Sequence, residues 1–133
     1  MASIFTRIIA GEIPSYKIAE DDQFYAFLDI RPLFKGHTLV VPKQEIDCYF
    51  DLDSKLLADS MLFCKKVAVA QKSVIECNRI GMTVMGLEVP HAHIHLIPIN
   101  SMKDMSFEQP PLELTSEEMT DIAKRIRDAY KLA

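Results

Sequence analysis

The chain has 133 residues, of which 49% are hydrophobic and 26% are charged. This length predicts one domain spanning residues 1–133, with enough chain to bury a core and too many apolar residues for global disorder. The formal net charge of −4 argues against a nucleic-acid polymer as partner, because such proteins usually present a basic face or arm. No apolar run approaches the roughly 20 residues of a membrane helix, so a membrane partner is not expected either.

The cysteines and the first residues indicate a cytoplasmic protein. Cys48, Cys64 and Cys77 are odd in number and widely spaced, and they form no Cys-x-x-Cys pair. We therefore expect reduced thiols, which are typical of the cytoplasm. Residues 1–14 contain a Gly, a Pro and no long apolar stretch, so a secretory signal is not expected.

The first forty residues predict short strands. Residues 3–10 favour a helical turn or an irregular segment that ends before Gly11 and Pro14. Aromatic and β-branched runs bounded by turn residues then predict strands at residues 16–20, 24–30 and 38–41. No helix fits between such closely spaced strands, so we expect them to pair antiparallel.

The rest of the chain predicts two helices and two further strands. Residues 56–76 form the long helix, with Asp51 or Asp53 as N-cap and an apolar stripe of Leu57, Met61, Cys64, Ala68 and Val69. Strands at 79–85 and 93–99 flank a turn near Gly86, and residues 102–114 connect them to a helix that begins at Thr115. This C-terminal helical extension, residues 110–133, has a capping box of Thr115 and Glu118 and a stripe of Met119, Ile122, Ala123, Ile126 and Tyr130. The predicted fold class is α+β.

Three of the four histidines lie within five residues, at His91, His93 and His95. On a strand this spacing places all three rings on one face, while Ala92, Ile94 and Leu96 face a buried side. Imidazoles in a buried strand are costly unless they have polar partners. The cluster therefore indicates a functional site.

Two kinds of chemistry suit this cluster. Imidazole binds several transition metals, but His91 and His95 would lie roughly 13 Å apart on a straight strand at ~3.3 Å per residue, which suits one tetrahedral ion poorly. Two of the triad together with His37 would be a better set of ligands. Alternatively, a neutral imidazole attacks phosphorus without the repulsion that an anionic nucleophile meets. We favour the nucleophile because it uses all three rings.

These residues resemble the histidine triad (HIT) superfamily, in particular its Hint-like and bacterial HIT members. Residues 91–97 read HAHIHLI and match its motif of three histidines alternating with apolar residues. Three further blocks resemble family segments in the same order: IFTRIIAGEIP at 4–14, AFLDIRP at 26–32 and GHTLVVPK at 36–43.

The resemblance implies a five-stranded antiparallel sheet with one long helix and a C-terminal helix, in a protein that forms a homodimer. It also implies a nucleotide hydrolase or transferase that acts at the α-phosphorus of a purine nucleotide conjugate, either a nucleoside phosphoramidate or a dinucleoside polyphosphate. His93 would attack phosphorus and form a nucleotidyl-histidine, His91 would hold His93 through its backbone carbonyl and pair with His37, and His95 would contact the phosphate and leaving group. Asp29 would bind the ribose, and the base would lie among Ile4, Phe5, Phe27 and Ile30. No metal and no cofactor is expected.

One segment departs from the family pattern. Met85, Leu87 and Glu88 stand where relatives usually carry an Asn, a Gln and a Ser or Thr, so the usual side-chain donors to phosphate are replaced. Glu88 adds negative charge near the expected anion, although the backbone N–H groups around Val89 could still bind it. This departure keeps an alternative open, in which the protein is a nucleotide-binding or regulatory module without turnover.

Overall fold

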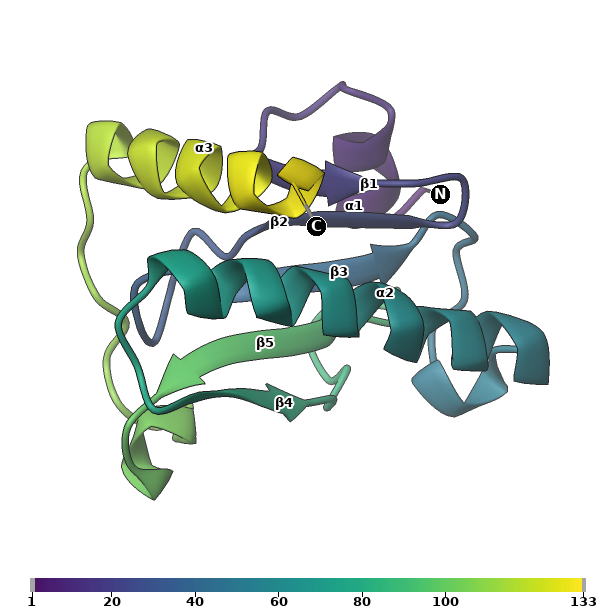
Figure 1. The fold of residues 1–133 in the computed structure, drawn as a ribbon. Coiled ribbons are helices and arrows are strands. Elements are labelled where there is room, and N and C mark those ends of the chain that lie inside the picture. Colours follow the sequence, from purple (N-terminus) through teal and green to yellow (C-terminus); the bar gives the residue numbers. More distant parts are fainter. Residues whose placement is uncertain (1, 133) are drawn as a thin grey trace.

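A single antiparallel sheet organises the computed structural model, which describes residues 2–132. Its five strands lie in the order β1-β2-β3-β5-β4 (Figure 1). The strands are β1 (Lys17–Glu20), β2 (Phe24–Leu28), β3 (Thr38–Pro42), β4 (Arg79–Thr83) and β5 (Ile94–Ile99). The predicted five-stranded α+β architecture is therefore confirmed, with strand ends that differ from the predicted ones by one or two residues.

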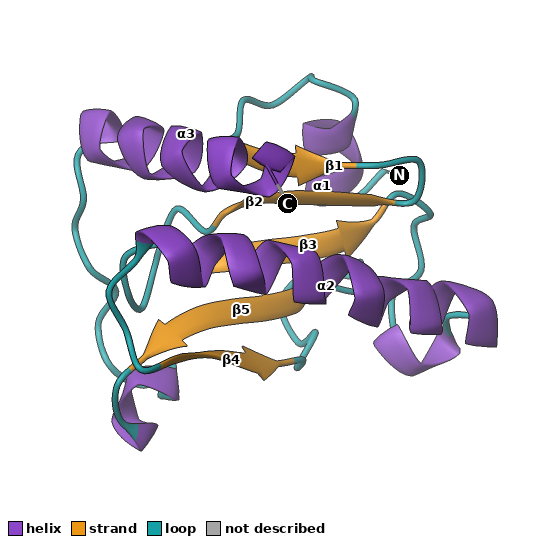
Figure 2. Ribbon diagram, viewed as in Figure 1, coloured by secondary structure: helices purple, strands orange, loops and turns teal. Residues whose placement is uncertain are grey.

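Helices cover both faces of this sheet. The two long helices α2 (Ser54–Val74) and α3 (Ser116–Leu132) pack on one face (Figure 2). The short helix α1 (Ile4–Ile9) packs on the other face, where Phe5 joins Phe27 and Leu39 in a separate apolar cluster. Two 3-10 turns, η1 (Tyr49–Asp51) and η2 (Met102–Met105), complete the regular elements. Because both faces are covered, every residue of β2 and β3 is buried.

The caps of the two long helices follow the sequence closely. Asp53 accepts a hydrogen bond from the Leu56 N–H and so is the N-cap of α2. Thr115 and Glu118 exchange the two hydrogen bonds of the predicted capping box at the start of α3. Among residues 2–132, no helix combines the length and the apolar character that crossing a bilayer requires.

The predicted apolar stripe of α2 is wrong. Of its five residues only Cys64 is buried, while Met61 and Val69 are more than half exposed. The buried face consists of Leu56, Ser60, Phe63, Cys64, Val67, Ala70 and Gln71. Ser60 and Gln71 in this face are polar, and a prediction based on apolar residues alone does not include them.

Gln71 joins α2 to the two strands that carry histidines. Its amide nitrogen lies 2.9 Å from the Gly36 carbonyl and 3.0 Å from the Leu96 carbonyl, in a fully buried position. Gly36 precedes His37 and Leu96 follows His95, so one side chain fixes the backbone next to both rings.

Replacing Gln71 with Leu should lower the free energy of unfolding by about 1–2 kcal/mol, because buried carbonyls lose a donor. Chemical denaturation monitored by circular dichroism would measure the change. Lys72→Leu changes the exposed neighbouring residue of the same helix and should stay within about 0.5 kcal/mol of the wild type. Equal losses in the two variants would contradict the role given to Gln71.

Candidate active site

The three triad histidines do not share one strand face as predicted. Strand β5 begins at Ile94, so only His95 belongs to it. His91 and His93 lie in the irregular segment before the strand, which is held by hydrogen bonds from the His91 N–H to the Val89 carbonyl and from the Ala92 N–H to the Ile46 carbonyl. The alternating pattern is identical in a strand and in this extended segment, so sequence could not place the boundary.

The hydrogen-bond partner of His93 determines which of its ring nitrogens carries the proton. The ring nitrogen Nδ1 lies 2.8 Å from the backbone carbonyl of His91, as the family resemblance implied. A carbonyl only accepts hydrogen bonds, so Nδ1 carries the proton. The neutral ring therefore has its lone pair on Nε2, in a side chain that lines a cavity.

His91 is locked from both sides of its ring. Its Nε2 donates to the Pro42 carbonyl at 2.8 Å, so its Nδ1 accepts, at 2.7 Å, from the Ser3 hydroxyl. The expected pairing of His91 with His37 is wrong, because the His91 ring bonds Ser3 at the start of α1 and the Pro42 carbonyl at the end of β3 that is remote from His37.

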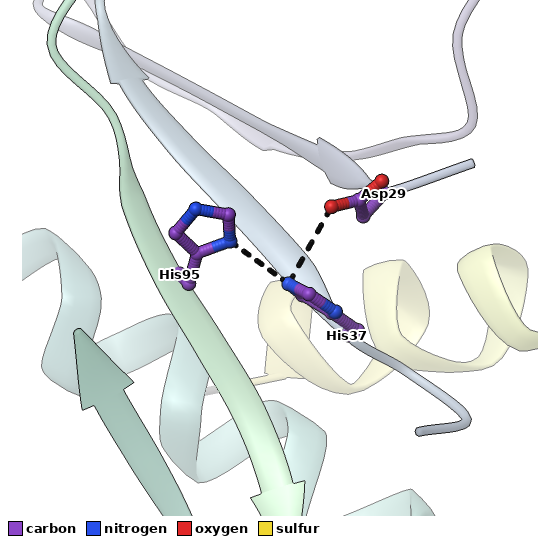
Figure 3. Close-up of side chains that lie close together, drawn as sticks. All are labelled: Asp29, His37 and His95. Atoms are coloured by element: carbon purple, nitrogen blue, oxygen red, sulfur yellow. Dashed lines mark hydrogen bonds and ion pairs between the residues drawn. The ribbon is translucent and has the colours of Figure 1, made fainter. Parts of the chain in front are cut away.

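His37 instead pairs with His95, as Figure 3 shows. The Leu33 N–H donates to His37 Nδ1 at 3.0 Å, which leaves the His37 proton on Nε2. This proton is donated to His95 Nδ1 at 2.9 Å, and His95 therefore carries its own proton on Nε2. Asp29 lies nearby, with one carboxylate oxygen 3.5 Å from His37 Nε2.

A glycine turn places His37 beside His95. Gly36 has a positive φ of 83°, which residues other than glycine rarely adopt. A Cβ at this position would also lie 3.0 Å from the Ile75 side chain. The β3–β5 register, in which Leu39 faces His95, then brings the start of β3 alongside the triad.

Burial keeps the rings of His37, His91 and His95 neutral. Desolvation, followed by the like charges of His37 and His93, lowers the pKa of His95 to about 3. Desolvation also lowers the pKa of His37, against a smaller raising effect of Asp29, and it lowers the pKa of His91. At neutral pH, these three rings therefore act as hydrogen-bonding groups of fixed polarity.

Asp29, His37 and His95 also form the one metal-like cluster found within residues 2–132, since their ligand atoms lie within 4.8 Å of one another. The hydrogen bonds disfavour a metal there. Two nitrogens on a tetrahedral zinc ion stand roughly 3.4 Å apart, given Zn–N distances of about 2.0–2.1 Å. His37 Nε2 and His95 Nδ1 are only 2.9 Å apart, and the Leu33 N–H already occupies Nδ1 of His37. An ion on Nε2 would require His37 to lose its only proton.

The cavity beside the triad has a volume of about 310 Å³. It brings together four predicted site residues, Asp29, Glu88, His93 and His95. Its other lining residues are Arg31, Leu33, Met85, Gly86, Leu87, Phe107, Gln109 and Pro111. The opening is thus bounded by the segment that departs from the family pattern and by residues 107–111.

The predicted base-binding residues lie on the α1 side. Phe5 and Phe27 are buried and meet edge to face with ring centres 5.7 Å apart, and Val89 packs against their cluster. Phe5 also meets His93 edge-on at 5.1 Å. Ile4 and Ile30 are exposed, at 48% and 75%. The two phenylalanines therefore form an apolar wall against the His93 ring and not a stacked pair, and none of the four predicted base-binding residues is among those that line the cavity.

Sequence reasoning missed Phe107. Its ring lies edge-on to His95 with centres 4.9 Å apart, and it also approaches His37. The segment from Met102 to Leu114 was expected only to connect two elements, and an isolated Phe in it carries no periodic signal. Ser3, Thr6 and Glu45, which surround His91, were missed for the same reason.

Comparison with known proteins agrees with this geometry. The family model for the HIT domain matches residues 10–102. The chain belongs to the HIT family. An adenosine 5'-monophosphoramidase of Schizosaccharomyces pombe is 34% identical, and the alignment covers 98% of this chain and all of the relative. The adenosine 5'-monophosphoramidase of Saccharomyces cerevisiae is 41% identical over 73% of this chain and 62% of its own length.

A solved HIT structure supports the fold as well. The crystal structure of a HIT-like protein from Bartonella henselae superposes with a TM-score of 0.83, covers 96% of this chain and 95% of its own, and is 32% identical. That protein is described as involved in cell-cycle regulation. At a general level, these HIT relatives support nucleotide hydrolase activity for this chain.

The buried neutral histidines should make stability depend on pH. The ordinary pKa of histidine is 6.5, whereas burial lowers the pKa of His95 in the folded chain to about 3. Below pH 6.5 the unfolded chain therefore binds a proton at His95 that the folded chain does not bind. Stability should therefore fall as pH drops from 6.5 toward 5, above the range where carboxylates titrate. Denaturation at several pH values would measure this slope. His95→Gln, which cannot ionise, should show a shallower one, and an unchanged slope would contradict the assignment.

Proposed function

We propose that this HIT protein hydrolyses or transfers a purine nucleotide at its α-phosphorus through a nucleotidyl-histidine on His93. The observation that carries this proposal is the hydrogen bond from His93 Nδ1 to the His91 carbonyl, which places the lone pair on Nε2 of a ring that lines the cavity. A nucleoside phosphoramidate or a dinucleoside polyphosphate would be the substrate.

The reaction has two balanced steps. In the first, the Nε2 lone pair of His93 forms a bond to phosphorus, and the bond from phosphorus to the leaving group breaks with its electron pair moving to that group, which takes up a proton from solvent when it is an amine. In the second, a water oxygen attacks phosphorus, the N–P bond breaks, and the water proton passes to solvent. Hydrolysis releases the nucleoside monophosphate, and another acceptor in place of water gives transfer.

Neighbouring groups suit the substrate's other parts. The Nε2 proton of His95 can donate to a phosphate oxygen without any change of charge. Asp29 is held by the Arg31 N–H on one carboxylate oxygen, and its carboxylate suits a ribose diol. The apolar wall of Phe5 and Phe27, with Ile4 and Ile30 beside it, would pack against the base.

A nucleotide-binding module without turnover is the second candidate. Leu87 is 91% exposed at the cavity and offers no polar atom to phosphate, and Glu88 beside it adds negative charge. This reading keeps the same pocket and predicts binding without a covalent adduct.

We also propose that the protein is a cytoplasmic homodimer. β4 pairs only with β5 and so forms an edge of the sheet. Met82 on this strand is 43% exposed, and α2 exposes Met61 and Leu62 by 52% and 68%. Such apolar exposure beside an unpaired strand edge fits a second copy of the chain. The three cysteines are unpaired thiols, which suits a reducing compartment.

Intact-protein mass spectrometry tests the chemistry. Wild-type protein mixed with an adenosine phosphoramidate and quenched at alkaline pH should carry one adenylyl group, because N–P bonds to histidine are labile to acid. His93→Ala should carry none and release no AMP. Its affinity for AMP, measured by calorimetry, serves as the control for folding.

Each outcome of this experiment decides between the candidates. AMP released by the wild type alone, without an adduct, would fit a fast second step that depends on His93. Equal turnover by His93→Ala would overturn the mechanism. AMP binding with neither adduct nor turnover in the wild type would favour the non-catalytic module.

Sedimentation tests the dimer. The wild type should sediment at about twice the chain mass of 15.1 kDa. Leu62→Glu should shift the protein toward the monomer, because it places a charge on the exposed face of α2. Leu132→Glu alters an even more exposed leucine, 90% against 68%, at the end of α3 and should remain dimeric. A monomeric wild type would contradict the proposal.

A further inference from the structure

A second hydrogen-bond network lies behind the nucleophile, on the side of His91 that faces α1. It consists of Ser3, Thr6, Glu45 and His91, which come from three separate parts of the chain. Ser3 is the N-cap of α1, where its hydroxyl oxygen accepts from the Thr6 N–H at 3.0 Å. The same hydroxyl lies 2.7 Å from His91 Nδ1.

Glu45 joins Ser3 and Thr6 at the outer end of this network. One carboxylate oxygen accepts from the Ser3 N–H at 2.7 Å and from the Thr6 hydroxyl at 2.6 Å. The Thr6 proton is thus directed to Glu45, while the Ser3 proton is directed to His91 Nδ1, whose ring proton lies on Nε2 against the Pro42 carbonyl. These bonds from Ser3 and Thr6 lower the pKa of Glu45, so the carboxylate stays an acceptor.

The network ends at the nucleophile. With Ser3 on one nitrogen and the Pro42 carbonyl on the other, the His91 ring has a single orientation. The backbone carbonyl of this same residue accepts the His93 Nδ1 proton. Holding His91 therefore holds the oxygen that selects which nitrogen of His93 keeps its lone pair.

We propose that Glu45 is a positioning residue for His93, acting through Ser3 and the ring of His91. The residue is solvent-exposed, so it acts by accepting two hydrogen bonds and not by placing a buried charge. The proposal rests on the nucleophilic role of His93. The network also links His93 to α1, because Phe5 of that helix contacts the His93 ring.

Two variants remove the network, and a third keeps its acceptor. Glu45→Ala removes both accepted bonds, and Ser3→Ala removes the donor to His91. Glu45→Gln keeps an amide oxygen that can accept both bonds. Asp53→Ala is the matched control, because it removes an N-cap from α2 as Ser3→Ala does from α1, far from the histidines. Glu12→Ala removes another exposed glutamate just after α1.

The first readout is independent of activity. In proton NMR, the imidazole N–H protons of His91 and His93 should give downfield signals protected from exchange by the Pro42 and His91 carbonyls. We expect both signals to exchange faster in Glu45→Ala and Ser3→Ala and to persist in Glu45→Gln and in the two controls. Unchanged signals in Glu45→Ala would overturn the proposal.

The second readout is the single-turnover rate of adenylyl transfer from an adenosine phosphoramidate. Glu45→Ala and Ser3→Ala should lower this rate about tenfold, since small misplacements of a nucleophile are costly, with a smaller change in KM. Combining the two changes should add little, because both interrupt one path. Glu45→Gln should recover most of the rate. Additive losses, or an equal loss in Asp53→Ala, would contradict the proposal, whereas a wild type without turnover but with intact NMR signals would contradict only the proposed function.

Discussion

The hydrogen bond between His93 Nδ1 and the carbonyl of His91 is the contact on which the site depends. It distinguishes the two ring nitrogens of His93, one of which becomes a donor while the other keeps its lone pair. A second such assignment begins at the Leu33 N–H and passes through His37 to His95. Both assignments start at backbone groups, whose polarity cannot change with pH. The site is therefore set by the fold and not by the titration of its side chains.

The two faces of the sheet differ in role, because one carries the main hydrophobic core and the other carries the candidate site. On one face, the core residues of β2, β3 and β5 pack against α2 and α3. On the other face lie α1, the phenylalanine wall and His95. Gln71 crosses this division, because it reaches from the helix layer to the backbone next to both His37 and His95. Its mutation tests whether the two faces are energetically linked.

The sequence was informative where local chemistry decides structure. The strands, the Asp53 and Thr115 caps and the His93 contact followed from turn residues, capping patterns and the family motif. It failed where tertiary partners decide. The α2 stripe was misplaced by about one residue because apolar residues lie on both faces of the helix, and Ser60 and Gln71 are buried with polar partners. The partner of His37 was wrong because the resemblance assigned it to His91, whereas the β3–β5 register brings His37 to His95. Glu45 is distant in sequence from His91, and no pattern connects them.

The cavity has walls of two different origins. His93, His95 and Asp29 belong to the sheet or to its immediate turns, whereas residues 85–88 and 107–111 are loops outside any strand. The second loop is attached near the pocket by the hydrogen bond from the Leu112 N–H to the Pro32 carbonyl. The hydrogen bonds of the histidines are made by residues outside both loops. Evolution can thus vary the shape of this cavity while the histidine array is inherited unaltered.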